Sequence, residues 1–483
     1  MRVSNFFFTA ATVLSLASHI SARRLETSAF RLDQPVIHAA PSSSHRLPSQ
    51  FNITAGIVGK DQNLAFVLES NHHVASPDTH VQYLDVDGNT NPIDTSFYQT
   101  TKGSAWLQST GRAWKEVGWA RIVVIRTGKD PLFEGTFTVK STHYDIRLQN
   151  PIIQGSENDD NNRLMVYRTP SSPSRFLDSS SGAIDPPPRC MSAPRAAAPG
   201  LSLLPRDNRD LLNTINSTAG CPQTRQVAYI GVATDCSYSA GFSSPDAVHR
   251  NILNLVNTAS VVFETSFNIS LGLRNLTIAD SRCPNRSSEY MAWNSACPNG
   301  DMNWRLQRFS SWRGAVQDTT NAYWTLMTDC HNSGGEVGVS WVGELCNSGE
   351  EGRRFDRSAA GIGANVVART SAQWQVFTHE AAHMFGAIHD CNTDACASHL
   401  NTLTSSSQCC PRSPSSCDAD GAFIMNPSSS RAMSRFSACT RGDVCAQLGS
   451  GSVNTQCLVP VTAIEGINMT GVNSGRAGGT VLR

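Results

Sequence analysis

The chain has 483 residues, and its 39 basic and 39 acidic side chains give a formal net charge of zero. This balance, with no basic stripe and no G-x-x-x-x-G-K-[ST] phosphate loop, argues against a nucleic-acid partner and an acidic membrane surface. At about 150 residues per domain, the length predicts two to four units. The hydrophobic content of 40% is sufficient for globular cores.

Residues 1–22 have the pattern of a secretory signal peptide. Arg2 supplies positive charge, a mainly apolar run extends from Phe6 to Ala17, and Ala17 or Ala22 provides a small residue for cleavage. That run is too short to span a bilayer, and no later segment is long and apolar enough, so we expect no membrane span. We therefore predict secretion. Six N-x-[ST] sequons agree with a glycoprotein, at Asn52, Asn216, Asn268, Asn275, Asn285 and Asn468.

Residues 23–167 are predicted to form a β-rich domain, with strands at Trp119–Ile125 and Phe133–Val139. Residues 168–220 form a predicted linker, rich at first in Ser, Pro and Ala, where we expect an activating cleavage. The linker offers only single arginines, of which Arg206 is the candidate, and this places processing at a dibasic site in doubt.

The region that follows alternates strands and helices. Val227–Ala233 is a continuous apolar run of the kind found in buried strands. Pro245 suits the first turn of a helix whose apolar residues then recur at helical spacing. Ser270–Leu276 is the next predicted strand. This alternation favours a mixed α/β layer.

Residues His379–Asp390 read H-E-x-x-H-x-x-G-x-x-H-D. On a helix, His379 and His383 project from the same face and can share one Zn²⁺. Gly386 permits a positive φ that ends the helix and turns the chain, which lets His389 approach as the third ligand. Three protein ligands leave a fourth position open for water, as in catalytic zinc sites. A structural zinc site without an open position is the competing interpretation.

Glu380 follows the first ligand and is the predicted general base, which takes a proton from water activated by zinc. Thr370-x-x-Gln373 has the form of a capping box, so the helix is expected to begin there. The opposite side of this helix is apolar and is predicted to face the core, through Trp374, Phe377, Ala381 and Phe385.

Met425 lies in a short apolar run that ends in an Asn-Pro turn signal. Extended zincin motifs place a methionine on a tight turn beneath the metal after the third histidine. Met425 is the candidate for that position, and an ordinary core methionine is physically a similar assignment.

Fourteen of the 15 cysteines lie between Cys221 and Cys457, and an even set in a secreted chain predicts disulfides. Their connectivity cannot be deduced. We expect those just after His389 to cross-link the loops around the site. A second zinc site built from cysteines is disfavoured, because the chain has no C-x-x-C pair.

These motifs together resemble the metzincins, specifically reprolysin or ADAM-type metalloproteases of the fungal ADAM-like branch. Asp390 after the third histidine points to reprolysins. Gln307–Arg313 resembles the family's F-x-x-W-R helix, Gly335–Gly343 its edge strand, and Arg435–Cys439 its F-S-x-C segment. The resemblance extends over about residues 225–458.

The resemblance implies an α/β metzincin catalytic domain at residues 221–460, with a twisted, mostly parallel sheet and an active-site helix. A β-rich prodomain would precede it, assist its folding and inhibit it. One catalytic Zn²⁺ is implied. Protein or peptide substrates would add to an antiparallel edge strand at Val337–Val342 through backbone hydrogen bonds.

Cys190 is the odd thiol and stands before the catalytic region. A thiolate is a good zinc ligand and can fill the open position. The resemblance therefore implies a cysteine switch, although no Gly follows Cys190 as the family's flanking sequence requires. An intermolecular disulfide and a buried spare thiol are the alternatives.

Residues 461–483 are rich in Gly, Ser and Thr and are predicted to be a disordered tail. No cysteine follows Cys457, so the sequence does not support the disintegrin region usual in ADAM-type proteins. The sequence predicts a secreted zinc endopeptidase made as a latent zymogen. The alternative is a catalytically silent homologue that binds peptides or proteins.

Overall fold

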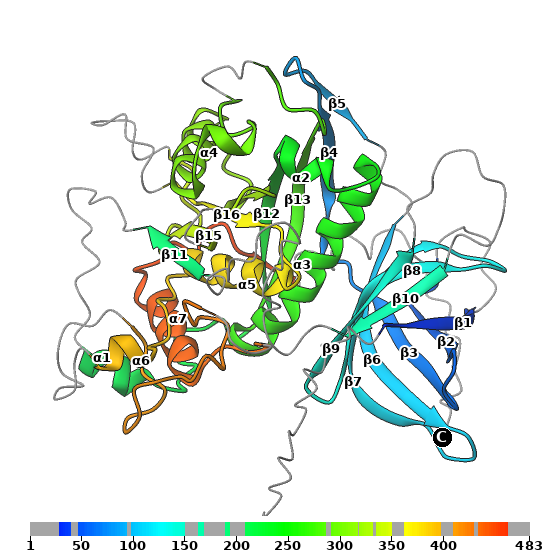
Figure 1. Cartoon of the computed structure of the whole chain (residues 1–483). Helices are drawn as coiled ribbons and strands as arrows, with labels where there is room; N and C mark the ends of the chain where they lie inside the picture. The colour runs from blue at the N-terminus through cyan, green and yellow to red at the C-terminus, as the bar shows by residue number, and fades with distance from the viewer. Residues whose placement is uncertain are drawn as a thin grey trace, which may run out of the picture.

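The computed structural model describes residues 29–39, 47–93, 98–149, 163–168, 189–193, 208–285, 291–316, 318–331, 335–349, 362–397, 409–428 and 433–461, with the backbone alone for 189–193. The predicted signal peptide and nearly all of the predicted tail lie outside these ranges. Two bodies stand side by side, a β-barrel and a larger α/β body (Figure 1).

Eight antiparallel strands close the barrel in the order β1-β10-β9-β8-β7-β6-β3-β2. Apolar side chains alternate along β2, so that Phe51, Ile53, Ala55 and Ile57 point inward, as the two-residue repeat of a strand requires. The predicted strands at 119–125 and 133–139 are confirmed within β7 and β8. The barrel strands are β1 (Ala29–His38), β2 (Gln50–Ile57), β3 (Gln62–Ser70), β6 (Gln99–Ser109), β7 (Lys115–Arg126), β8 (Leu132–Val139), β9 (Thr142–Gln149) and β10 (Arg163–Arg168).

The second sheet has the order β11-β15-β16-β14-β12-β13-β4-β5. Its middle strands β13, β12, β14 and β16 are parallel, β15 runs antiparallel to β16, and β17 pairs with β12. These strands are β4 (Ala75–Leu84), β5 (Thr90–Pro92), β11 (Arg189–Ala193), β12 (Gln226–Thr234), β13 (Ile269–Ala279), β14 (Trp324–Thr328), β15 (Glu336–Trp341), β16 (Ala364–Ala368) and β17 (Val459–Pro460).

Strands from the N-terminal part of the chain lie at both edges of this sheet. The β11 strand pairs in parallel with β15, and β4 pairs in parallel with β13. The strand expected to be a free edge for substrate, at 337–342, therefore has a neighbour. Because β11 and β15 are about 150 residues apart, no local pattern in the sequence indicates this pairing.

The helices of the α/β body pack against the sheet and one another. The predicted helix start at Pro245 is confirmed, because Ser244 caps α3 by accepting from the backbone N of Ala247. Helix α3 contacts β13, and α5 contacts β15, β16 and α3. The helices are α1 (Asn208–Thr214), α2 (Cys236–Ala240), α3 (Pro245–Phe267), the 3₁₀ turn η3 (Cys297–Asn299), α4 (Met302–Val316), α5 (Gln373–Met384), α6 (Thr393–Ala397) and α7 (Ala438–Ser450).

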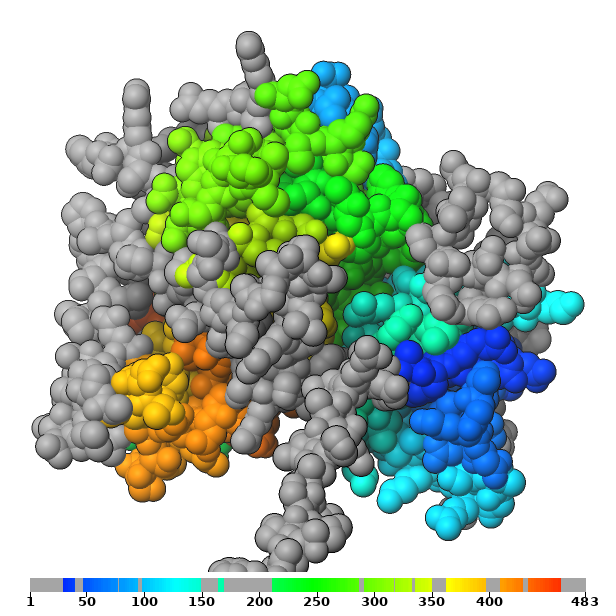
Figure 2. Space-filling model, in the orientation of Figure 1, coloured from blue at the N-terminus to red at the C-terminus, as the bar shows by residue number. Residues whose placement is uncertain are grey.

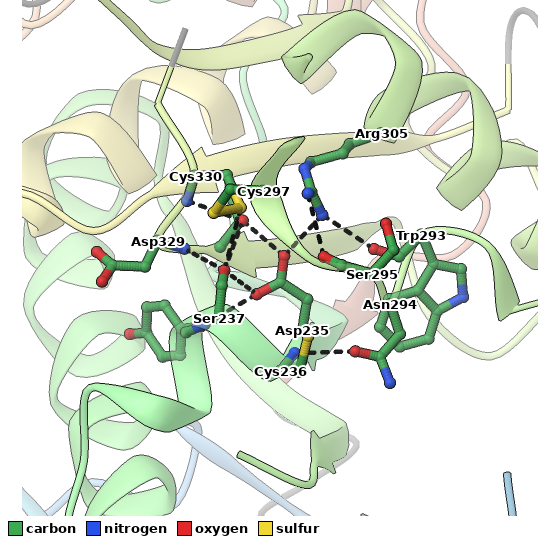
Figure 3. Close-up of polar contacts among 12 residues, drawn as sticks. Asp235, Cys236, Ser237, Trp293, Asn294, Ser295, Cys297, Arg305, Asp329 and Cys330 are labelled. Atoms are coloured by element: carbon green, nitrogen blue, oxygen red, sulfur yellow. Dashed lines mark hydrogen bonds and ion pairs between the residues drawn. A yellow bond between two sulfur atoms is a disulfide. The ribbon is translucent and has the colours of Figure 1, made fainter. Parts of the chain in front are cut away.

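A buried ion pair fixes α4 to the ends of β12 and β14 (Figure 3). Asp235 accepts from Arg305 Nη1 at 2.9 Å, Thr328 Oγ1 at 2.6 Å, Ser237 Oγ at 2.6 Å and Tyr238 N at 2.9 Å. Both charged side chains are fully buried. Removing one partner would leave a buried unpaired charge, at a cost of about 3–5 kcal/mol.

The predicted disulfide framework is confirmed, because all fourteen cysteines from Cys221 to Cys457 are paired. Three bonds connect the segments that follow the histidine motif, which supports the expected cross-linking of those loops. The pairs are Cys221–Cys445, Cys236–Cys283, Cys297–Cys330, Cys346–Cys457, Cys391–Cys409, Cys396–Cys417 and Cys410–Cys439.

The barrel contacts the α/β body through a buried histidine. The ring of His143, on β9, packs on Trp374 at the start of α5, with centroids 4.8 Å apart, and on Trp119 of β7 at 5.4 Å. Burial lowers the pKa of His143 to about 4, although the charge of Asp145 opposes the shift. The imidazole is therefore neutral at pH 7 in the folded chain.

We predict that His143 weakens the fold in acid. The unfolded chain takes up this proton near pH 6.5, whereas the folded chain does so only near pH 4. Stability is therefore lost as the pH falls through that window, by about 3 kcal/mol from this group. His143→Phe should flatten the fall in urea-unfolding free energy between pH 7 and pH 4.5. The exposed His38→Gln serves as the control, and an equal slope in wild type and His143→Phe would contradict the assignment.

Candidate functional site

Helix α5 holds the first two histidines of the motif and Glu380. The helix begins at Gln373, with Ala372 as its N-cap and no side-chain cap bond. The predicted capping box is therefore wrong: the Thr370 hydroxyl accepts from the backbone N of Ala372 at 3.3 Å, before the helix starts. The predicted apolar side of the helix is confirmed, since Trp374, Phe377, Ala381 and Phe385 are all buried in the core.

The three motif histidines converge. The Nε2 atoms of His379 and His383 are 3.1 Å apart, and those of His383 and His389 are 3.3 Å apart. The potential ligand atoms of all three lie within 4.8 Å of one another. Bonds of about 2.0–2.1 Å from a tetrahedral zinc ion to three nitrogens would separate these nitrogens by about 3.3 Å. The observed spacing fits that geometry.

The opposite ring nitrogens define where the protons are. His379 Nδ1 lies 2.6 Å from the carbonyl oxygen of Ile424, and His383 Nδ1 lies 2.7 Å from that of Ala387. A carbonyl only accepts, so each Nδ1 carries the proton and each Nε2 presents a lone pair to the centre. Lone pairs at this distance repel one another, and a cation between them removes the repulsion. The donor set therefore fits a divalent metal such as zinc.

Burial keeps the three imidazoles neutral. It lowers the pKa of His383 to about 4 and that of His389 to about 3, and it holds the pKa of His379 well below its ordinary value. The neutral form of histidine is the one that can bind a metal, so all three side chains are in the form suited to metal binding at physiological pH.

Gly386 forms the turn that the motif predicts. Its φ is +89°, and the backbone N atoms of Gly386 and Ala387 close the helix on the carbonyl oxygens of His383 and Ala382 at 2.9 and 3.1 Å. A Cβ atom at Gly386 would lie 2.6 Å from Oε1 of Gln447. Gln447 in α7 donates to the Gly386 carbonyl, so the turn is held from a distant helix.

Asp390 connects the third ligand to two other segments. Its backbone N donates to the carbonyl of Met425 at 2.8 Å, and its Oδ1 accepts from Ser437 Oγ at 2.5 Å and Thr440 Oγ1 at 3.2 Å. Ser437 is also the N-cap of α7. Burial raises the pKa of Asp390 to about 7, against these hydrogen bonds.

Met425 is fully buried on a tight turn closed by the bond from Asn426 N to the Phe423 carbonyl at 3.1 Å. The preceding residue, Ile424, provides the carbonyl that orients His379. The turn thus contacts α5 through His379 and contacts the residue after His389 through the backbone of Asp390.

Glu380 is fully buried and its carboxylate lies beside β15. A Cβ atom at Gly338 would lie 2.2 Å from Glu380 Oε1, so only glycine allows the carboxylate this position. Ser340 Oγ donates to the Glu380 carbonyl at 3.2 Å and fixes the helix to the same strand.

Cys190 is placed by its backbone, in β11, where its Cα pairs with that of Gly338. Its side chain is outside the described part of the structure. Cys190 is therefore the direct partner, on the neighbouring strand, of the glycine that lies against Glu380. The binding of zinc by the Cys190 thiol stays a prediction.

Sequence analysis missed several residues that support the site. The carbonyls of Ile424 and Ala387 carry no side-chain signal. Ser437, Gln447 and Gly338 are distant in sequence from the motif, and only Gly338 and Ser437 of these three lie in segments noted for their resemblance. A second cluster of cysteines, at Cys391, Cys396 and Cys417, has its sulfurs in disulfides and is not a metal site.

Comparison with known proteins agrees with this geometry. The profile of the reprolysin group of metallopeptidase family M12 matches residues 223–437. Residues 223–437 belong to that family. The family implies a metzincin fold and a divalent metal, typically zinc.

Relatives extend the match over most of the chain. It is 38% identical to disintegrin and metalloproteinase domain-containing protein B of Aspergillus fumigatus, over 93% of this chain and 63% of the relative. Identity to the protein of that name from Arthroderma benhamiae is 36%, over 95% and 64%. The chain thus spans less than two thirds of these relatives. Metalloproteinase-II from Bacteroides fragilis has a TM-score of 0.37 and 10% identity, over 84% of this chain and 92% of the other.

We predict that Gly386→Ala destabilises the protein by about 1–3 kcal/mol, because alanine is strained at this φ and contacts Gln447. His389 should shift with the turn, so zinc affinity should fall as well. Urea unfolding and competition with a zinc chelator measure the two effects. Gly451→Ala is the matched control, because its φ of +73° is similar but its Cβ would meet no atom. Equal zinc affinity in the two variants would contradict the role of the turn.

Proposed function

We propose that this protein is a zinc-dependent endopeptidase made as a latent zymogen. The observation that carries the proposal is the convergence of the Nε2 atoms of three buried neutral histidines, with Glu380 on the same helix as two of them. Zinc in this site would be held by His379, His383 and His389. Asp390, Gly386 and Met425 would hold the ligands in place through the contacts described above.

Zinc bound there would lower the pKa of a water molecule and polarise the scissile carbonyl. Glu380 would accept the proton of the attacking water and transfer it to the leaving amine. Its burial against Gly338 restricts the carboxylate to the strand side of the helix. The carbonyls of Ile424 and Ala387 would keep the ligand rings oriented during the reaction.

Protein or peptide substrates would bind in an extended form along β15. The pairing of β11 with β15 supports this proposal, because residues Arg189–Ala193 already lie as an extended segment along the outer edge of β15. In the unprocessed chain the same pairing would exclude substrate. We propose that Cys190, in register with Gly338, adds a thiolate to the metal and completes the latency.

Secretion is part of the proposal. Seven disulfides are expected in an oxidising compartment. Among the residues that the structure describes, none of the helices has the length and apolar character needed to cross a bilayer. The activating cut would fall between β11 and α1, in the predicted linker.

We expect Glu380→Gln to retain zinc and lose peptide hydrolysis by roughly 10²–10⁴-fold, since the amide cannot accept the proton. The measurement is kcat/KM on a peptide library after proteolytic cleavage between β11 and α1, with zinc content determined in parallel. Asp394→Asn, which changes an exposed carboxylate on α6 to an amide, is the control. A processed wild-type protein that binds peptides but never cuts them would favour the silent homologue instead.

Cys190→Ala should raise the activity of the unprocessed chain on short peptides toward that of the processed enzyme, because one zinc position becomes available. Met191→Ala, on the same strand, is the control that tests whether any side-chain change in β11 is sufficient to raise this activity. If Cys190→Ala leaves the activity unchanged, the thiol is not the inhibitory ligand and the pairing of β11 alone accounts for latency.

A further inference from the structure

A hairpin from the N-terminal part of the chain belongs to the α/β sheet. Strands β4 and β5 follow β3 and precede β6, which are neighbours in the barrel, yet they lie at the outer edge of the other body. In Figures 1 and 2 this hairpin, in light blue, lies against the green segments and away from the other blue strands. It is on the edge opposite β11.

The pairing with β13 is continuous along the second half of β4. Registered pairs run from Asn275 and His80 to Ala279 and Leu84. Backbone bonds continue beyond the strand ends, from Leu273 N to the Val74 carbonyl at 2.6 Å and from Asp280 N to the Leu84 carbonyl at 2.8 Å.

Apolar side chains of the hairpin complete the core of the α/β body. Val74, Val81 and Leu84 have exposures of 0, 4 and 1% and belong to the core cluster of that body, whereas the barrel has a separate core. The N-terminal segment therefore contributes buried surface that the catalytic sheet would otherwise expose.

Side-chain hydrogen bonds fix the register. Gln82 Nε2 donates to Thr277 Oγ1 at 2.9 Å, and Tyr83 OH donates to Asp280 Oδ2 at 2.7 Å. Thr79 Oγ1 donates to the carbonyl of Leu273 at 3.1 Å. Each of these bonds joins β4 to β13 or to the residue that follows it.

A glycine on β13 permits the close approach. A Cβ atom at Gly272 would lie 2.3 Å from the carbonyl oxygen of His73. Any other residue at 272 would separate the segment that leads into β4 from β13. The glycine at position 272 of β13 is therefore matched to the close approach of the segment that leads into β4.

The barrel makes a different kind of contact. Glu134 pairs with Arg250 at 3.0 Å, and Arg121 pairs with Glu264 at 2.7 Å. Between the two bodies lies a cavity of about 570 Å³ with charged side chains in its walls, including Arg147 from the barrel and Arg369 from the α/β body. This contact combines these ion pairs and the cavity with the packing of His143 on Trp374 and the burial of Val123 in the core of the α/β body.

We propose that the outer edge of β13 is a strand-addition site whose occupant is β4, and that this pairing keeps the N-terminal segment bound after the chain is cut. An added strand gains affinity from backbone hydrogen bonds and specificity from alternate side chains. Loss of β4 would leave β13 with an open edge and exposed apolar residues. The inference depends neither on zinc nor on Cys190, so it stands or falls separately from the proposed protease activity.

The test is a cut of the full chain at a protease site inserted between Arg168 and Arg189. This cut leaves β11 on the C-terminal piece, so the N-terminal piece is held only by the hairpin and the barrel. The two pieces should co-elute in size-exclusion chromatography. Val81→Ala should weaken their association by roughly tenfold or more, because two buried methyl groups are lost.

Matched variants separate the contacts. Gln82→Ala combined with Tyr83→Phe removes two edge bonds without opening the core, and should also weaken association if Val81→Ala fails to fold. Thr90→Ala, on the exposed β5, should leave the affinity unchanged, and Glu134→Gln should have less effect than the β4 variants. Separation of the wild-type pieces on cutting would overturn the proposal. So would unchanged affinity in both β4 variants.

Discussion

The site depends on one constraint: the Nε2 atoms of three imidazoles lie close together in a buried place, with His383 Nε2 at 3.1 Å from that of His379 and 3.3 Å from that of His389. Two backbone carbonyls, of Ile424 and Ala387, fix the protons on the far side of the rings and so enforce this arrangement. The helix, the glycine turn and the Met425 turn all serve to bring those carbonyls and rings together. A cation at the centre turns a repulsive arrangement into a stable one.

Buried polar groups hold this arrangement in place from a distance. Asp390, the residue after His389, accepts a hydrogen bond from Ser437, the N-cap of α7, and Gln447 of the same helix donates to the Gly386 carbonyl. A buried ion pair between Asp235, which follows β12, and Arg305 likewise holds α4 against the sheet. Because each of these groups is buried away from water, removal of its hydrogen-bond partner would lower the stability of the fold. These contacts therefore hold the site rigid.

The N-terminal part of the chain is bound at both edges of the catalytic sheet. One edge, β15, is next to Glu380, and the other, β13, is remote from it. In the proposed zymogen, pairing at β15 would exclude substrate, whereas pairing at β13 would hold the N-terminal segment at a distance from Glu380. Inhibition and retention would then be separate functions of the two edges, and one cut in the linker need not end both.

The sequence by itself determined what depends on local spacing: the helical faces of α3 and α5, the positive φ at Gly386, and the histidines that a helix followed by a turn brings together. It also determined that fourteen cysteines pair, but not which ones. Only the tertiary structure decided the disulfide partners, the carbonyls that orient the rings, the contact of Gly338 with Glu380, and the addition of β4 and β11 to a distant sheet. Strand pairing and side-chain burial bring together residues that are far apart in the chain. The local periodicity of a single sequence does not predict which distant residues meet.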